Sequence, residues 1–597
     1  MMRRISRTPA FPGRGFEGAG INSCMGRHAH WPASFAACVL IWSALIWSRP
    51  ALAQGRGGAD WTTANADAQR TSWVRADARI TKESVQSPDF KLAWKLKLDN
   101  APRQLNSLSQ PVHMGITYGL FTVTPLVFVA GSSDNVYGID GDMGRVLWKK
   151  NFSPAGTPQP AGSLACPGGM TAGLTRPTVL APAPAAAAGA GRGGRGGRAG
   201  AAGGAVGEPF AGAPNLAAAD SARGGGGGGA AAGVSGGRGG PGAASGGRAG
   251  GGGGGGGGAN SLYAISSDGF LHSLNVQNGA DTAPPVPFLP ANASPSGLIL
   301  INNVVYAAGG PDCGGAPNSL WAMDLNTPGK TVSSWRSASG GVAGAAGPAF
   351  GSDGTIYVAT GGSGSGSLVA LEPGTLKAKE WYAPAKTAFD STPVVFPYKG
   401  KDLVVVSGND GRLHLLDGSS PGGADHQTPL YATPVLTSRW AGGALAGYED
   451  ANGARWVLAS AGGPVNGLPA ANGAVTNGAV IALKLTDQNG KLSLEPEWAS
   501  RDMMSPLPPM VIGSVIFALS SGEYRSADAS VSMAQRVQRS TPAVLYALDP
   551  ATGKELWSSG GKITSFAHSG GLSAGAASVY VSTYDSTLYA FGFPLER

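Results

Sequence analysis

Short segments in which apolar and polar residues alternate recur along most of the chain. The clearest, Val544 to Trp557 (VLYALDPATGKELW), contains one strand, a turn at Asp549 to Gly553, and a second strand that ends in Trp. Asn135 to Trp148 (NVYGIDGDMGRVLW) repeats the same spacing. Alternation with a period of two predicts β-strands, and the Gly, Asp and Asn residues between them predict turns. Because no stretch has a convincing helical period, the pattern predicts an all-β fold.

Eight copies of this unit can be counted, and nearly all are preceded by another short strand. A repeat of roughly 58 residues with four short strands is typical of the blades of a β-propeller. We therefore predict a single eight-bladed β-propeller built from four-stranded antiparallel blades. The remaining copies begin at Ser261, Ser319, Ser367, Arg412, Ala479 and Thr587.

The two ends of the repeat region are each incomplete. The last copy stops at Arg597 without a fourth strand, whereas Phe90 to Leu98 (FKLAWKLKL) is a strand without a neighbour in sequence. We predict that this N-terminal strand completes the C-terminal blade, because that pairing closes the ring and removes an open sheet edge.

Residues 181–260 form a Gly-, Ala- and Arg-rich tract with almost no aromatic or β-branched side chains. Such a segment cannot bury enough apolar surface to offset the entropy of ordering it, so we predict a disordered insertion within the second blade. An RGG-like tract can bind RNA or another anionic polymer, but a linker is the favoured interpretation for an exported chain.

Residues 1–53 have the pattern of a secretory signal peptide. The apolar run Phe35 to Trp47 is too short to span a bilayer, and Ala51 and Ala53 follow it at small-residue cleavage positions. A true start at Met25 gives an ordinary basic leader. We therefore expect residues 54–597 to form a periplasmic or secreted propeller that does not span a membrane.

The formal net charge of +8 resides in the leader and in the Gly-rich tract, so the repeat region is nearly neutral. A basic surface for nucleic acid is not supported there, and we expect a monomer with no nucleic-acid partner.

Only Cys166 and Cys313 remain after cleavage, both in Gly- and Pro-rich loops. A disulfide between them and two separate thiols both fit the sequence. Neither lies in a CxxCH or paired CxxC motif, so we expect no haem and no zinc.

The units LYALDPATGKELW and NVYGIDGDMGRVLW resemble the tryptophan-docking repeat of propellers of the pyrroloquinoline-quinone (PQQ) type, the quinoprotein alcohol dehydrogenase-like superfamily. Residues 59–73 (ADWTTANADAQRTSW) are similar to the segment that opens many such chains. The resemblance implies that the Ala, Gly and Trp residues of the repeat lock neighbouring blades together. It also implies that dehydrogenases of this kind bind PQQ with Ca²⁺ or a lanthanide. The adjacent cysteines of those enzymes are absent here, and their metal ligands cannot be placed on this sequence.

Four local clusters supply candidate site residues. We single out Asp502 as a weak candidate for a catalytic base, beside Arg501. As weak candidates for cofactor binding we take the residues at the starts of inner strands or in long loops between strands: Arg439, Trp440, Arg501, Glu523 and His568, with Tyr524, Arg525 and His113 close to them in pattern. For each of these the favoured alternative is structural, since an Arg beside an Asp is more often an ion pair and a His opening a strand more often only donates a hydrogen bond.

Two functions from different classes follow. The first is an exported module that binds a protein or small ligand on its top face, with PQQ among the candidate ligands. The alternative is a PQQ-dependent dehydrogenase of an alcohol or sugar, in which Asp502 acts as the base and Arg439 or Arg501 polarises the quinone carbonyls. A polysaccharide-cleaving propeller, which needs a pair of carboxylates at a fixed distance, is a more distant third.

Overall fold

The computed structural model describes residues 60–594 except for 76, 119–122, 154–161, 181–259, 311, 339, 363, 527, 529 and 569. The predicted signal peptide therefore lies outside the described residues, as does the predicted insertion apart from Asn260. Among the described residues, no helix is long and apolar enough to cross a membrane.

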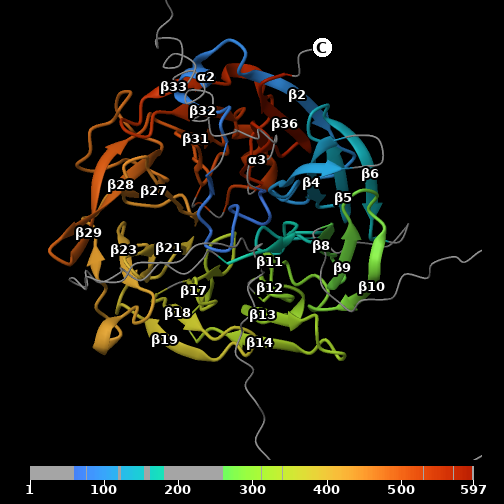
Figure 1. Ribbon diagram of the computed structural model, residues 1–597, viewed down its shortest axis with the longest axis horizontal. Helices are drawn as coiled ribbons and strands as arrows, with labels where there is room; N and C mark the ends of the chain where they lie inside the picture. The colour runs from blue at the N-terminus through green and yellow to red at the C-terminus, as the bar shows by residue number, and fades with distance from the viewer. Residues whose placement is uncertain are drawn as a thin grey trace, which may run out of the picture. The chain divides into compact units, whose positions relative to one another are not determined.

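Eight sheets surround a common axis, which confirms the predicted eight-bladed β-propeller (Figure 1). The first four blades are formed by β3 (Val112–Tyr118), β4 (Val123–Gly131), β5 (Asn135–Asp140) and β6 (Arg145–Asn151); β8 (Ser261–Ile265), β9 (Phe270–Asn275) and β10 (Asp281–Pro287); β11 (Ser296–Ile301), β12 (Val304–Ala308), β13 (Ser319–Asp324) and β14 (Val332–Arg336); and β16 (Ala349–Phe350), β17 (Ile356–Gly361), β18 (Leu368–Leu371) and β19 (Ala378–Tyr382). The other four are formed by β21 (Val394–Tyr398), β22 (Lys401–Ser407), β23 (Leu413–Asp417) and β24 (Tyr431–Ala432); β26 (Ala446–Glu449), β27 (Arg455–Ala461), β28 (Ala479–Gln488) and β29 (Lys491–Ala499); β30 (Met510–Ile512), β31 (Val515–Ser520), β32 (Val544–Leu548) and β33 (Glu555–Ser558); and β34 (Leu572–Gly575), β35 (Ser578–Ser582), β36 (Thr587–Gly592) and β2 (Lys91–Lys97).

The second blade departs from the four-stranded pattern, since its sheet contains three strands, β8 to β10. Its innermost place is taken by a short segment in which Thr175 pairs with Tyr263 of β8 through an isolated bridge. The unit that begins at Ser261 thus supplies the second and third strands of its blade. The Gly-rich tract follows β7 (Pro177–Thr178), which pairs with β11 of the third blade, and ends where β8 of the second blade begins, so its two attachment points belong to neighbouring blades.

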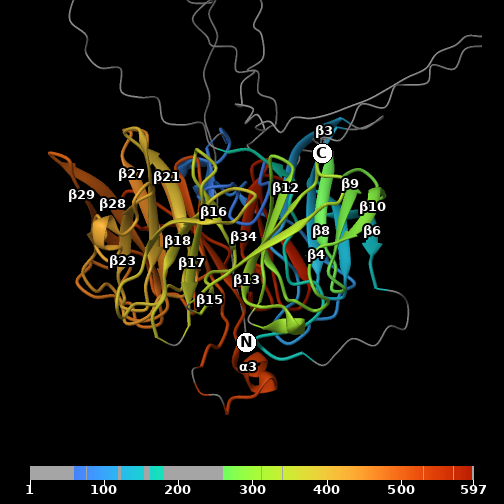
Figure 2. The same cartoon turned by 90° about the horizontal axis from the view of Figure 1, so that it is seen from below.

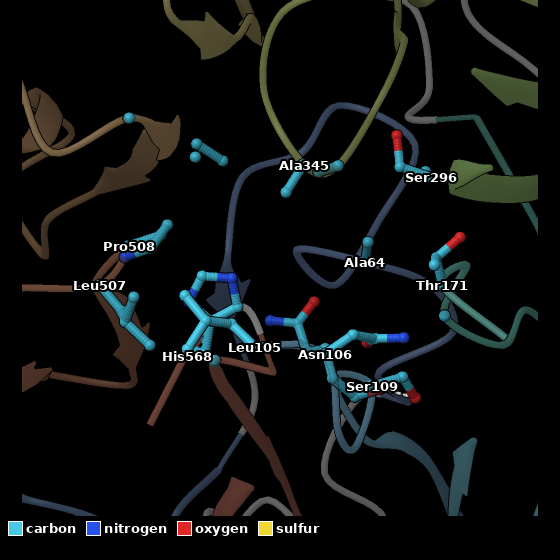
Figure 3. Close-up of a pocket in the computed structure, with 18 of the residues that line it drawn as sticks. Ala64, Leu105, Asn106, Ser109, Thr171, Ser296, Ala345, Leu507, Pro508 and His568 are labelled. Atoms are coloured by element: carbon cyan, nitrogen blue, oxygen red, sulfur yellow. Dashed lines mark hydrogen bonds between the residues drawn. The ribbon is translucent and has the colours of Figure 1, made fainter. Parts of the chain in front are cut away.

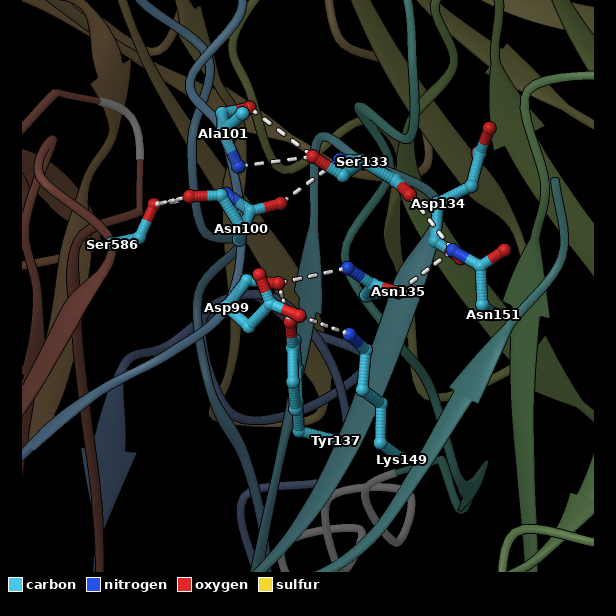
Figure 4. A network of polar contacts seen from close by, with 10 residues as sticks. All are labelled: Asp99, Asn100, Ala101, Ser133, Asp134, Asn135, Tyr137, Lys149, Asn151 and Ser586. Atoms are coloured by element: carbon cyan, nitrogen blue, oxygen red, sulfur yellow. Dashed lines mark hydrogen bonds and ion pairs between the residues drawn. The ribbon is translucent and has the colours of Figure 1, made fainter. Parts of the chain in front are cut away.

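The N-terminal strand closes the ring as predicted, because β2 pairs antiparallel with β36. Where the chain passes from the last blade to the first, a network of polar contacts surrounds it (Figure 4). Ser586 donates a hydrogen bond to the carbonyl of Asn100 at 3.0 Å, and Lys149 of β6 pairs with Asp99 at 2.8 Å. The junction is therefore held by side chains from both blades as well as by the sheet.

The segment from Asp60 to β1 (Trp73–Val74) lies along the inside of the ring. Successive inner strands donate backbone hydrogen bonds to its carbonyls, from His113 N to Trp61 O at 2.9 Å through to Val511 N to Ser72 O at 2.9 Å. The blades in between contribute Arg176, Phe350, Val395 and Gly447 in the same way. This N-terminal segment thus links most of the blades at the axis. Short inner strands extend three sheets: β7 (Pro177–Thr178) runs parallel to β11, β1 runs parallel to β30, and β15 (Gly341–Val342) pairs antiparallel with β17. Another pair, β20 (Ser391–Thr392) and β25 (Gly443–Ala444), forms a separate two-stranded parallel sheet.

Tryptophans dock between blades at three junctions. The indole Nε1 atoms of Trp94, Trp148 and Trp498 donate to backbone carbonyls of the next blade at 2.9, 2.9 and 3.0 Å. Trp381, which the spacing groups with them, is 42% exposed and stacks on His426 with 3.8 Å between ring centroids. The docking pattern is therefore not uniform around the ring.

Within the part of the chain that the structure describes, α-helices occur in two connections, although the sequence pattern predicts none. Both α2 (Lys82–Gln86) and α3 (Met533–Arg539) begin with a capping box, formed by Thr81 and Ser84 in α2 and by Ser532 and Gln535 in α3. Viewed edge-on, α3 projects from one end of the ring (Figure 2). Single 3₁₀ turns lie at Cys313–Gly315, Gly423–Asp425 and Gly560–Lys562.

Candidate functional site

A cavity of about 380 Å³ lies on the propeller axis (Figure 3). Its walls are the segments that lead into the inner strands of several blades, and Ala64 and Asn65 of the N-terminal segment also line it. Most of the lining residues are Ala, Gly, Ser or Pro, whose small side chains leave the axis open. The labelled members of the lining in Figure 3 are Ala64, Leu105, Asn106, Ser109, Thr171, Ser296, Ala345, Leu507, Pro508 and His568.

Long polar side chains in the lining are held by the backbone around them. Gln110 accepts a hydrogen bond from Asn65 N at 3.0 Å and donates to Leu572 O at 2.5 Å. Asn106 donates to Met170 O at 2.8 Å. These contacts fix the positions of the amides, because each joins a blade to another blade or to the N-terminal segment.

One charged cluster lies at this cavity, formed by Glu523, Arg525 and His568. The Nε of Arg525 lies 2.9 Å from Oε2 of Glu523, and Nδ1 of His568 lies 3.0 Å from the same oxygen, at an angle outside hydrogen-bond geometry. Arg525 and His568 line the cavity, whereas the Glu523 side chain is only 2% exposed. Burial by itself raises the pKa of Glu523, but its contacts with His568 and Arg525 outweigh burial and hold that pKa below its ordinary value.

The cluster is assembled by loops from two blades. Glu523 and Arg525 lie in the long connection between β31 and β32 that also contains α3, and His568 precedes β34. Arg525 donates a further hydrogen bond through Nη1 to Ala441 O at 2.9 Å, which fixes the guanidinium across the cavity wall. A guanidinium has five N–H donors, and these two contacts use two of them.

A disulfide joins two loops beside the cavity. Cys166 and Cys313 are linked, with their Cα atoms 5.5 Å apart. The residues next to Cys166, Ala165 and Pro167, line the cavity. The bond therefore fixes a part of the cavity wall to the third blade, where Cys313 lies between β12 and β13.

Asp502 and Arg501 lie outside the cavity lining. Asp502 accepts hydrogen bonds from the backbone N–H groups of Thr476 and Asn477 at 2.9 and 2.7 Å. Burial raises the pKa of Asp502, but these and further hydrogen bonds from residues 476–478 outweigh it, so the net pKa is lowered. Arg501 pairs with Glu555 and lies over the ring of Tyr546, 4.5 Å from its centroid. Both residues thus make contacts that hold loops and blades together.

Arg439, Trp440 and His113 also lie outside the lining. Arg439 donates to Gly462 O at 2.7 Å, and Trp440 is buried in a hydrophobic cluster of the fifth and sixth blades. His113 is fully buried, and burial lowers its pKa to about 4. Of the sequence candidates, the structure therefore brings Glu523, Arg525 and His568 together and leaves the others apart.

The amides of Asn65, Asn106 and Gln110 are site residues that the sequence analysis did not single out. Asn65 lies within residues 59–73, the segment similar to the start of PQQ-type chains, and this similarity was the one available signal. Asn106 and Gln110 lie in an irregular connection without a repeat pattern, so nothing in the sequence marked them.

No family model and no curated protein matches the chain. Among solved structures, it is similar to a europium-containing methanol dehydrogenase, with a TM-score of 0.50 and 12% identity over 90% of this chain and 98% of that one. The quinohemoprotein alcohol dehydrogenase from Comamonas testosteroni has a TM-score of 0.49 and 14% identity over 90% of this chain and 81% of that one. BamB from Moraxella catarrhalis has a TM-score of 0.40 and 12% identity over 85% and 99%. At these identities the likeness shows the fold alone.

Proposed function

The chain has the eight-bladed fold of the PQQ-type β-propellers, and we propose that it is an exported binding module that takes a small acidic ligand into its axial cavity. The observation that carries the proposal is Arg525, which lines a cavity of about 380 Å³ and has donors left after its contacts with Glu523 and Ala441. A fixed guanidinium with free N–H groups suits a carboxylate, which accepts two parallel hydrogen bonds.

Glu523 has a positioning role in this proposal. Its carboxylate is buried and remains charged, so it orients Arg525 and His568 at the cavity. Because the negative charge of Glu523 faces the permanent positive charge of Arg525, the charges of the cluster nearly cancel without a ligand, and the remaining N–H groups of Arg525 are available to an anion. The small Ala, Gly, Ser and Pro residues of the lining leave room for the rest of the ligand.

Export is part of the same proposal. The leader at residues 1–53 has the pattern of a signal peptide, and the Cys166–Cys313 disulfide is of a kind that persists in oxidising compartments. Both observations support a periplasmic or secreted location.

The alternative function, oxidation of an alcohol or sugar with bound PQQ, needs an aromatic floor for the quinone and oxygen ligands for Ca²⁺ or a lanthanide. Among the described residues, the cavity lining contains no Trp, Tyr or Phe, and no group of three His, Cys, Asp or Glu side chains is placed to hold a metal. The donor set of the described residues does not fit PQQ with its cation. We therefore keep the dehydrogenase as the competing hypothesis and rank ligand binding first.

Thermal unfolding of the mature chain with acetate, succinate, citrate, or PQQ with Ca²⁺ separates the two functions. At a ligand concentration of about 100 times Kd, binding stabilises the folded state by about 2.7 kcal/mol. We expect succinate or citrate to raise the melting temperature of the unmodified chain and of Arg439→Ala, an exposed arginine outside the lining, but not of Arg525→Ala. Equal loss in both variants, or no response to any carboxylate, contradicts the proposal. Alcohol-dependent dye reduction with PQQ that is lost in Asp502→Ala establishes the dehydrogenase instead.

A further inference from the structure

His568 and Arg525 stand side by side at the axial cavity, because both contact one oxygen of Glu523. Nδ1 of His568 lies 3.0 Å from Oε2 of Glu523, and Nε of Arg525 lies 2.9 Å from the same atom. Both side chains line the cavity, where the imidazole forms part of the wall beside Leu105 (Figure 3). A ligand that reaches the guanidinium therefore also meets the imidazole.

The contact with Glu523 decides which ring nitrogen of a neutral His568 carries the hydrogen. The contacts of Glu523 hold its pKa below the ordinary value, so its carboxylate is charged at neutral pH and only accepts hydrogen bonds. A lone pair on Nδ1 would face this negative charge at 3.0 Å and be repelled by it. An N–H group at Nδ1 is attracted instead, even at an angle outside hydrogen-bond geometry. We therefore assign the hydrogen to Nδ1, which leaves a lone pair on Nε2.

Nε2 of His568 is then an acceptor at the cavity wall. Nδ1 is buried and has no hydrogen-bond partner among the described residues, whereas the side chain as a whole is 32% exposed. Since Nδ1 is covered, this exposure belongs to the rest of the ring, whose one polar atom is Nε2. An acceptor in this place needs a donor from the ligand, and a hydroxyl group supplies one.

Arg525 presents the opposite kind of group, because a guanidinium only donates. Its contacts with Glu523 and Ala441 leave N–H groups that suit a carboxylate. The wall thus offers donors for a carboxylate next to an acceptor for a hydroxyl. A 2-hydroxy acid carries its hydroxyl on the carbon next to the carboxylate, so one ligand satisfies both groups. A 2-oxo acid has an acceptor in that position, and an unsubstituted acid has no polar group there.

We infer, on the basis of the proposed function, that the acid bound in the axial cavity is a 2-hydroxy acid and that His568 is the residue that selects it. Arg525 binds the carboxylate, and Nε2 of His568 accepts a hydrogen bond from the neighbouring hydroxyl. Glu523 positions both, since a single oxygen of its side chain contacts the two of them. His568 determines specificity in this scheme, and no bond of the ligand is broken.

Titration calorimetry with matched acids tests the inference on the mature chain, at about pH 9, well above the ordinary pKa of an imidazole. Each enantiomer of malate is compared with succinate, and citrate with tricarballylate, because these pairs differ only in the hydroxyl group. 2-Hydroxyglutarate and 2-oxoglutarate are compared with glutarate in the same way. We expect the hydroxy acids to bind about tenfold more tightly than the acids without the hydroxyl, since one hydrogen bond is added. 2-Oxoglutarate should bind no more tightly than glutarate.

His568→Asn removes Nε2 but keeps an amide that can donate toward Glu523. We expect the preference for malate over succinate to fall from about tenfold to about one in this variant. His426→Asn is the matched control, because His426 is also 32% exposed and its Nδ1 also faces a glutamate, Glu380 at 3.6 Å, but it lies outside the cavity lining. Asn also tolerates the φ of +55° at that position. The control should keep the preference of the unmodified chain.

Nitrogen NMR of the histidine side chains gives a second measurement, which uses the unmodified chain and does not require a substituted protein to fold. The neutral ring of His568 should carry its hydrogen on Nδ1, and malate should shift the Nε2 resonance more than succinate does. Melting temperatures identify any variant that fails to fold.

The outcomes separate this inference from the proposed function. Equal affinities for malate and succinate overturn the inference and leave the proposed function standing, whereas no binding by any of the acids overturns both. Three other results also overturn the inference: tighter binding of 2-oxoglutarate than of 2-hydroxyglutarate, a preference for malate that survives in folded His568→Asn, and a neutral His568 ring with its hydrogen on Nε2.

Discussion

The N-terminal segment and the axial cavity that it helps to line share one axis but are built in opposite ways. The segment is packed among the blades, and its backbone carbonyls accept hydrogen bonds from one inner strand after another. The cavity has walls of small residues and a guanidinium, that of Arg525, with donors left over. A propeller axis must be filled in one part to hold the blades together, and can be left open in another part to receive a ligand.

The side chain of Arg70 shows how closely the N-terminal segment is packed between the blades. Its side chain is 0% exposed and donates to the carbonyls of Pro348, Ala64 and Gly297 at 2.8, 2.7 and 3.2 Å and to the hydroxyl of Thr63 at 3.1 Å. Burial lowers the pKa of Arg70 to about 9, although the charge of Asp67 opposes this shift. Arg525, in contrast, is partly exposed and shares its charge with Glu523. A buried arginine such as Arg70, whose N–H groups all face fixed acceptors of the protein, stabilises the fold. An arginine at the wall of a cavity, such as Arg525, can instead donate hydrogen bonds to a ligand.

The largest effect should come from Arg70→Met. The substitution leaves several buried carbonyls without donors and removes one of the positive charges that act on the buried Asp67, so we expect the unfolding free energy to fall by about 4 kcal/mol or more. Urea denaturation followed by circular dichroism measures the change. Arg79→Met is the matched control, because Arg79 is exposed and lies over the Phe593 ring at 5.2 Å, a contact with an expected contribution of at most about 1 kcal/mol. Similar losses in both variants would mean that the N-terminal segment does not hold the ring.

The next effect should come from the disulfide, which gives the open part of the axis a covalent constraint. Cys166 and Cys313 are separated by 147 residues, so Cys166→Ala with Cys313→Ala should lower the unfolding free energy by about 3 kcal/mol. The melting temperature of the unmodified chain should also fall on addition of a thiol reductant, while that of the double variant should not change. A reductant effect that persists in the double variant would point to a cause other than this bond.

The repeat made the fold predictable, because each copy carries its own alternation and turn residues and needs little information from elsewhere in the chain. The prediction that residues 90–98 close the ring followed from the incomplete sheet at each end of the repeat region, and the pairing of β2 with β36 confirms it. The short α3 had a local signal too, since Ser532 and Gln535 form a capping box, but its seven residues are too few to show a helical period.

The site was less predictable because it depends on where loops meet. Glu523 and His568 belong to connections of different blades, and their 3.0 Å contact follows from loop conformation that no repeat encodes. Asp502 had the right chemistry for a base, but its Oδ1 accepts hydrogen bonds from backbone N–H groups of residues 476–478 and its Oδ2 accepts from the side chains of Thr476 and Asn477, contacts between two irregular segments. The missing tryptophan of the fourth blade was hidden for a related reason, since Trp381 lies one residue beyond the docking position in the strand register.

The smallest of these effects concerns the charge at the open part of the axis. Since the pKa of Glu523 in the folded chain lies below its ordinary value of 4.5, the folded state binds fewer protons there than the unfolded state. The stabilisation is therefore complete above about pH 4.5 and is lost as the pH falls through the lower folded pKa. At neutral pH, Glu523→Gln should lower the unfolding free energy by about 2 kcal/mol, because Arg525 loses a charged acceptor and His568 loses a negative charge beside it. As the pH falls below 4.5 the difference between the two proteins should shrink, which urea denaturation at a series of pH values from 7 downward measures. Arg70→Met provides the comparison, since its loss should persist across the series. A Glu523→Gln deficit that stays constant with pH would show that the glutamate acts through its shape rather than its charge.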